Sequence, residues 1–146
     1  MERLPPEFSE FLRLLDRHNV KHLVIGGYAV AYHGYSRFTV DMDIWIEVNS
    51  AAAVRMVAAL KDFGFDAPDL KPELFLVKGN IMRMGVPPMR LEVLTEIDGV
   101  EFESCHANRV VAEVGDQKIS FISLDDLKRN KSASGRTKDL LDLENL

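Results

Sequence analysis

Two aspartates separated by a single residue, Asp41 and Asp43, are the side chains of this sequence best suited to chemistry. They begin residues 39–48, where polar and apolar residues alternate as in a strand whose two faces differ. Residues two apart on a strand point the same way, so the two carboxylates should leave the backbone roughly 7 Å apart. Carboxylates this close repel each other unless a cation neutralises them, and oxygen ligands suit Mg²⁺ or Mn²⁺. The pair therefore predicts a divalent-metal site.

A polar strand face in water is the simpler interpretation of an isolated Asp-x-Asp. In this segment Trp45 shares the face of the two aspartates, and Met42 and Ile44 lie on the opposite face. A tryptophan on the polar face and apolar residues on the other are not typical of a fully solvated strand.

A glycine pair, Gly26-Gly27, ends the apolar run at residues 20–25. The run predicts a strand that leads into a tight turn, followed by a short helix at residues 28–33. Glycines let a phosphate approach the backbone closely, and the start of a helix offers free N–H groups and a positive dipole end. Alone, the pair is a weak signal, and it lacks the Gly-x-Gly-x-x-Gly pattern of dinucleotide-binding sites.

The two motifs together resemble the signature of the polymerase-beta-like nucleotidyltransferase superfamily. Residues 25–27 (Ile-Gly-Gly) are followed, after a spacer of thirteen residues, by residues 41–44 (Asp-Met-Asp-Ile). With Arg37 and Thr39 just before the aspartates, the region is most similar to small prokaryotic nucleotidyltransferases. Many of these, including abortive-infection toxins, belong to toxin–antitoxin systems. The C-terminal segment 131–140, with its two lysines and an arginine, also resembles the end of such proteins.

The resemblance implies a third carboxylate on a neighbouring strand. Glu92, in residues 89–95, is the best candidate, at a position where small relatives more often carry aspartate. The competing interpretation is that Glu92 only pairs with Arg83 or Arg90. The resemblance also implies the cofactor, Mg²⁺ or Mn²⁺, and the roles of the other residues: catalysis and metal binding by Asp41, Asp43 and Glu92, and nucleotide binding by Gly26, Gly27, Arg37, Thr39 and Lys131.

A protein of this kind would move a nucleoside monophosphate from a nucleoside triphosphate to an acceptor hydroxyl on a protein, a tRNA end or a small molecule. The alternative is a nucleotidyltransferase-like module that has lost turnover and docks a partner protein of a toxin–antitoxin pair. A third interpretation is a plain structural domain with a polar strand face. The basic residues of segment 128–138 favour an RNA or phosphorylated partner, although the net charge of -5 opposes this and a solvated helix face is the simpler interpretation.

The 146 residues have the size of one domain, so we expect residues 1–146 to form a single nucleotidyltransferase-like domain. The expected fold class is α/β (α+β), a mixed sheet flanked by helices. Besides the elements above, the patterns predict helices at residues 7–18 and 50–63 and from residues 124 and 137, strands at residues 81–84 and 89–94, and a hairpin of residues 110–114 and 118–122. The last helix should bury Leu140 and Leu143.

No apolar run approaches the roughly 20 residues that span a bilayer, so no membrane partner is expected. The first residues also lack the apolar stretch of a signal peptide. A single cysteine, Cys105, excludes an intrachain disulfide and favours a reducing, cytoplasmic location. Cys105 and His106 are not expected to form a catalytic pair, because adjacent residues rarely face each other on regular structure.

Overall fold

A computed structural model describes residues 4–85 and 90–146 of the chain. Its strands are β1 (His22–Ile25), β2 (Met42–Ile46), β3 (Ile81–Met84), β4 (Leu91–Leu94), β5 (Val110–Val114) and β6 (Gln117–Phe121). Its helices are α1 (Pro6–Arg17), α2 (Gly26–Tyr32), α3 (Ser50–Phe63), α4 (Phe102–Ala107), α5 (Leu124–Ser134) and α6 (Thr137–Glu144), with a short 3₁₀ turn η1 (Pro72–Phe75).

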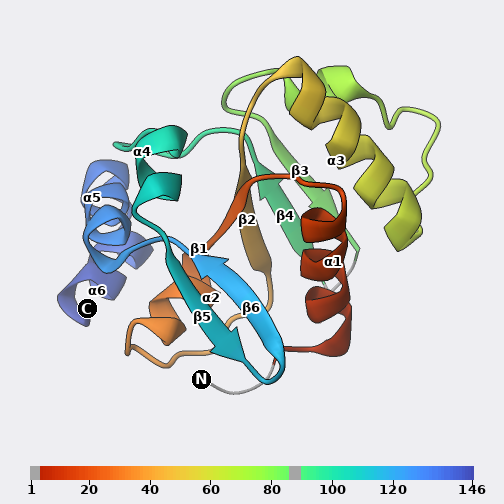
Figure 1. The fold of residues 1–146 in the computed structure, drawn as a ribbon. Coiled ribbons are helices and arrows are strands. Elements are labelled where there is room, and N and C mark those ends of the chain that lie inside the picture. The colour runs from red at the N-terminus through yellow and green to blue at the C-terminus, as the bar shows by residue number, and fades with distance from the viewer. Residues whose placement is uncertain (1–3, 86–89) are drawn as a thin grey trace.

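The strands form one six-stranded sheet in the order β3-β4-β2-β1-β6-β5. Pairs β2–β4 and β1–β6 are parallel, whereas β1–β2, β3–β4 and β5–β6 are antiparallel. Helices α1 and α3 lie together on one side of this twisted sheet, and α4, α5 and α6 gather on the other (Figure 1). The expected α+β fold, a mixed sheet flanked by helices, is confirmed.

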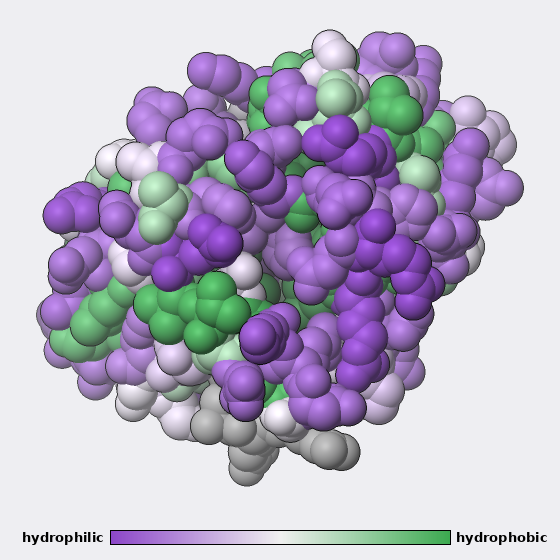
Figure 2. Space-filling view, viewed as in Figure 1, coloured by the Kyte–Doolittle hydropathy of each residue, from purple (hydrophilic) through white to green (hydrophobic). Residues whose placement is uncertain are grey.

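The core fills the space between the sheet and the helices. The apolar stripe predicted on the first helix is buried, with Phe8 and Phe11 fully enclosed. All four residues of β1 are buried, because this central strand is covered on both faces. Outside, hydrophilic residues cover most of the face seen in Figure 2, and apolar residues gather in a smaller area over β5 and α6, where Val111, Leu140 and Leu141 are exposed.

Local sequence signals set several helix ends as predicted. The side chain of Asn49 accepts a hydrogen bond from the backbone N–H of Ala52 at 2.8 Å and caps α3. Gly64 ends the same helix with φ of 108°, a left-handed conformation that favours glycine. Ser123 caps α5 through the N–H of Asp126 at 3.2 Å.

Three expectations about the elements need correction. The glycine pair does not form a turn before a helix, because Gly26 and Gly27 are themselves the first residues of α2. Strand β2 is shorter than expected and leaves Asp41 just before its first residue. Helix α4 and the turn η1 were not predicted, since both are short and lack a full amphipathic repeat. The predicted strand at residues 89–94 begins with Met89, which lies outside the described residues.

The buried face predicted for the last helix is wrong. Leu140 is exposed and Leu143 only half-buried, while Asp139 and Asp142 point inward and are buried. This inward face of α6 is acidic because cations from other elements lie beneath it.

Among the described residues, no helix has the length and apolar character needed to cross a membrane.

Candidate active site

Strand pairing brings the three predicted carboxylates to one place. The antiparallel pairing of β1 and β2 sets Asp43 opposite Ile25, the residue that precedes the glycine pair. The parallel pairing of β2 and β4 sets Glu92 directly beside Asp43. Asp43 therefore lies between the start of α2 and Glu92, in the middle of the sheet.

Asp43 is the most perturbed of these acids. It is partly buried, and its Oδ1 is shielded from solvent and has no hydrogen-bond partner among the described residues. Burial, together with the nearby carboxylates of Glu92 and Asp41, raises the pKa of Asp43 to about 7, whereas Lys138 opposes the shift. A carboxyl group in this state gains from any cation that replaces its missing partner.

The other two carboxylates are paired with arginines. Arg90 donates from Nε and Nη2 to the two carboxylate oxygens of Asp41, both at 2.8 Å. Arg83 donates from Nε to Oε1 of Glu92 at 2.8 Å. The alternative that Glu92 pairs with Arg83 is thus observed, and Arg90 instead holds Asp41. The two arginines offset part of the repulsion around Asp43.

Gly26 is needed because Asp43 packs against its backbone. A Cβ at Gly26 would overlap Oδ2 of Asp43 and lie 2.9 Å from its Cγ. The φ of Gly26 is also positive, at 64°, which side chains rarely adopt. Gly27 has a different neighbour: a Cβ there would lie 2.7 Å from Cβ of Thr39 and 3.3 Å from Nη1 of Arg37. The glycine pair thus lets the segment before β2 pack against the start of α2.

The Gly26→Ala variant is expected to be both less stable and defective at the site. A left-handed conformation costs a non-glycine residue roughly 1–2 kcal/mol, and the new methyl group must also displace the carboxylate of Asp43. Gly135→Ala is the matched control, because its φ of 65° is nearly that of Gly26 but nothing lies within 4 Å of its Cβ position. Urea unfolding should show a larger loss for Gly26→Ala. Equal losses in the two variants would show that contact with Asp43 does not matter.

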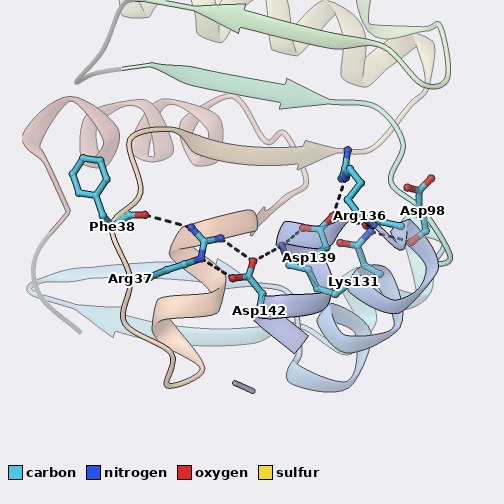
Figure 3. Close-up of polar contacts among 9 residues, drawn as sticks. Arg37, Phe38, Asp98, Lys131, Arg136, Asp139 and Asp142 are labelled. Carbon is cyan, nitrogen blue, oxygen red and sulfur yellow. Dashed lines mark hydrogen bonds and ion pairs between the residues drawn. The ribbon is translucent and has the colours of Figure 1, made fainter. Parts of the chain in front are cut away.

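Arg37 and Lys131, predicted to bind a triphosphate, are held by the acidic face of α6. Arg37 donates from Nε and Nη2 to the carboxylate of Asp142 at 2.7 and 2.9 Å. The ammonium of Lys131, itself buried, lies 2.9 Å from Asp139 and 3.1 Å from Asp142. Figure 3 shows Asp142 between Arg37 and Lys131, and Asp139 between Lys131 and Arg136. We call Arg37, Lys131, Asp139 and Asp142 the α6 ion-pair network.

The pKa values of the two aspartates reflect this network. Burial alone would raise the pKa of Asp139, but hydrogen bonds from Lys131 and Ser134 outweigh burial and lower it to about 2. Burial likewise opposes ionisation of Asp142, but Arg37 and Lys131 lower its pKa below the ordinary value. Both side chains are therefore held as carboxylates. The network ties α6 and α5 to the segment that leads into Asp41.

A pocket of about 610 Å³ lies over these residues. Its lining includes the glycine pair, the three carboxylates and Lys138, as well as Arg37 and Lys131. Thr39 is not part of the lining; its hydroxyl donates to the backbone carbonyl of Asp41 at 3.3 Å. The structure thus brings every predicted site residue to this pocket except Thr39, whose side chain packs against Gly27.

The described residues do not present a ready-made cluster of three or more acidic, histidine or cysteine ligands. Two of the three carboxylates are instead paired with arginines, Asp41 with Arg90 and Glu92 with Arg83. The donor set nevertheless fits a hard divalent cation, because it consists of carboxylate oxygens and one of them, Oδ1 of Asp43, has no partner.

Sequence interpretation missed three residues of this region. Asp142 was overlooked because an acid in a C-terminal helix is ordinarily exposed. Arg90 was considered only as a partner of Glu92, and its pairing with Asp41 depends on how β4 lies beside β2. Lys138 lines the pocket, and its positive charge lowers the pKa of Asp43.

Cys105 is buried, and burial raises the pKa of its thiol to about 12, which does not suit a nucleophile.

Comparison with solved structures identifies the fold. A protein from Thermotoga maritima inferred to be a nucleotidyltransferase superimposes with a TM-score of 0.65 and 16% identity, covering 99% of this chain and 94% of that one. A lincosamide antibiotic adenylyltransferase with bound lincomycin superimposes with a TM-score of 0.58 and 16% identity, covering 99% of this chain and 97% of that one. The chain has the nucleotidyltransferase fold.

A third neighbour with the nucleotidyltransferase fold is the antibiotic-resistance factor ANT(2'')-Ia, with a TM-score of 0.60 and 13% identity over 94% of this chain and 79% of that one. No family model matches the sequence, and no curated protein is significantly similar to it. At identities this low, the neighbours establish the fold and leave the chemistry to be argued from the site.

Proposed function

We propose that this protein is a nucleotidyltransferase that moves a nucleoside monophosphate from a nucleoside triphosphate to an acceptor hydroxyl. The observation that carries the proposal is the position of Asp43. Asp43 lies beside Glu92 and packs with Oδ2 against Gly26, while its Oδ1 has no partner among the described residues, in a pocket large enough for a nucleotide. A plain structural domain has no need for three acids at one point of its sheet.

In this proposal Asp41, Asp43 and Glu92 hold Mg²⁺ or Mn²⁺, which when bound neutralises charge on the triphosphate. The arginines that pair with Asp41 and Glu92 would then be released toward the phosphates. Lys138 makes no ion pair within the described part of the chain and lines the pocket, so it is more readily available than Arg37 or Lys131. We retain Arg37 and Lys131 chiefly as residues that position α6 beside the pocket.

In the transfer step, the acceptor oxygen forms a bond to the α-phosphorus. The bond from that phosphorus to the oxygen that bridges the α- and β-phosphates breaks. Pyrophosphate leaves with the electron pair of the broken bond. The proton of the acceptor hydroxyl passes to the carboxylate of Glu92, the proposed general base. Gly26 and Gly27 let the triphosphate approach the start of α2, where a side chain would obstruct it.

Calorimetric titration tests the proposal directly. ATP, GTP, CTP and UTP are titrated into the protein with magnesium and with EDTA, and into Asp41→Ala, Asp43→Ala and the control Asp116→Ala, whose aspartate is exposed in the β5–β6 turn. We expect at least one nucleotide to bind only with magnesium, and binding to disappear in the first two variants alone. A folded protein that binds none of the four would contradict the proposal and favour the docking module.

The toxin–antitoxin relationship and a protein partner rest on the sequence resemblance and stay predictions. The comparisons support neither. Measuring pyrophosphate release distinguishes an active transferase from an inactive module. Both bind nucleotide, but only the transferase cleaves it and releases pyrophosphate.

A further inference from the structure

A second pocket, of about 470 Å³, continues the proposed nucleotide site along the same face of the sheet. The two pockets share three lining residues, Glu96, Ile97 and Asp98, which follow β4. Trp45 also lines the second pocket and lies two residues beyond Asp43 on β2, so its side chain leaves the same face roughly 7 Å away. A molecule seated against Trp45 therefore lies next to Asp43 and Glu92.

The second pocket is strongly acidic. Five carboxylates and a single cation, Lys78, contribute to its lining. Glu47 is compensated by Arg55 at 3.6 Å and Lys21 at 3.9 Å. The other four acids make no ion pair with any residue that the structure describes: Glu96, Asp98, Glu101 and Glu103. Glu101 and Glu103 lie at the start of α4, where the helix dipole favours acids, so Glu96 and Asp98 are the two acids of this pocket whose charge is left without compensation.

The floor of this pocket contains an unsatisfied donor. Trp45 is only 2% exposed, and its Nε1–H has no hydrogen-bond acceptor among the described residues. Phe102 packs edge-on against the indole with ring centroids 5.1 Å apart. A buried N–H without a partner costs free energy, which a ligand oxygen would recover. Aromatic rings beside carboxylates also suit a cationic group.

The loop that carries Asp98 is fixed in place. Asn130 of α5 donates from Nδ2 to the backbone carbonyl of Asp98 at 3.0 Å, and the carboxylate of Asp98 points away from this contact (Figure 3). Its negative charge is thus held at the junction of the two pockets without a partner. An anionic acceptor, such as RNA, would be repelled by these carboxylates.

We propose that this acidic pocket is the acceptor site and that it takes a small molecule with several protonated amines and a free hydroxyl group. The inference rests on the proposed transferase function and names its acceptor class. The amines pair with Glu96 and Asp98, a hydroxyl or ether oxygen accepts from Nε1 of Trp45, and a further hydroxyl faces Asp43 and Glu92. The volume suits a ligand of about the size of a trisaccharide.

Trp45 is the single tryptophan of the sequence, so its fluorescence reports on this pocket alone. The probe is a β-1,4-linked glucosamine trimer, which carries three amines; the β-1,4-linked glucose trimer has the same skeleton without them. We expect a saturable change in fluorescence with the glucosamine trimer, weakened by added salt, and none with the glucose trimer. Equal responses to both sugars, or no response to either, would overturn the inference.

Two double variants test whether binding depends on the negative charge of this pocket or on the net charge of the protein. Glu96→Gln/Asp98→Asn removes two unpaired acids from the pocket, and Glu10→Gln/Glu113→Gln removes two exposed acids on α1 and β5. The first variant should bind the glucosamine trimer at least tenfold more weakly, while the second should match the original protein. An unchanged affinity in the first variant would overturn the inference.

The outcome also distinguishes the inference from the proposed function. Failure of the original protein to bind any nucleotide would refute the transferase and the acceptor role together. Nucleotide binding without binding of the glucosamine trimer would refute the acceptor class alone, as would transfer of labelled nucleotide to an RNA oligomer but not to the trimer. Mass spectrometry of the trimer after incubation with nucleotide and magnesium should show one added nucleoside monophosphate.

Discussion

Replacing Asp43 with asparagine is expected to lower nucleotide transfer by about 10²–10⁴-fold, the range found when a group central to charge stabilisation or proton transfer is lost. Asparagine keeps the shape of the side chain but supplies no negative charge to a cation at Oδ1. The rate is measured as pyrophosphate release with the nucleotide that binds best. Asp116→Asn, in the exposed β5–β6 turn, removes an equal charge and should retain the original rate.

The Asp43→Asn protein should also remain folded, which makes the loss of activity interpretable. Asp43 has an unpartnered oxygen and two acidic neighbours, so removing its charge relieves repulsion in the absence of metal. Urea unfolding in EDTA should therefore show a stability equal to or above that of the original protein. A variant that stays folded and turns over at the original rate would show that the centre of the site has been misplaced.

Replacing Lys131 with methionine is expected to destabilise the protein by about 3–5 kcal/mol, the usual cost of removing one partner from a buried ion pair. Lys131 lies between Asp139 and Asp142, and all three side chains are less than a tenth exposed. Methionine fills the same space but leaves two buried carboxylates with less compensation. Lys118→Met, at an exposed position of β6, is the control and should change stability by less than about 0.5 kcal/mol.

A double-mutant cycle with Asp139→Asn isolates the pair from other effects. Each single variant already removes the Lys131–Asp139 ion pair, so the loss in the double variant should be smaller than the sum of the single losses. Additive losses would mean that Lys131 stabilises the fold through packing rather than through its charge.

The same network predicts how stability depends on pH. Asp139 has a folded-state pKa of about 2, below its ordinary value of 3.8. A carboxylate with a lowered pKa contributes stability that is fully present above 3.8 and is lost as the pH falls toward 2. The difference in unfolding free energy between the original protein and Asp139→Asn should therefore shrink between about pH 4 and pH 2. A difference that stays constant over this range would contradict the role given to the network.

Much of the local structure followed from the sequence, because its causes are local. Asn49 and Gly64 delimit α3 through a side-chain cap and a left-handed residue, which depend only on neighbouring residues. The apolar stripe of α1 reported which face of that helix is buried. The spacing of the glycine pair and the two aspartates resembles a known signature, and the fold it implied is confirmed.

The ion pairs between charged side chains could not be predicted from such local signals. Arg90 contacts Asp41 across 49 positions of sequence, and Arg37 contacts Asp142 across 105. Such contacts depend on which strands are neighbours and how α6 returns to the sheet. An apolar pattern predicts burial by the hydrophobic effect, whereas a buried aspartate is predictable only when its cation is known.

The sequence by itself determined the ends of α3, the buried face of α1 and which acids could act together, because capping, periodicity and spacing depend only on nearby residues of the chain. The tertiary structure decided which of those acids are already neutralised and which lack a partner. It also placed an uncompensated acidic pocket, with an unsatisfied tryptophan, directly beside Asp43 and Glu92. Electrostatic interactions act through space rather than along the chain, so which charges remain without a partner is decided only once the strands are assembled.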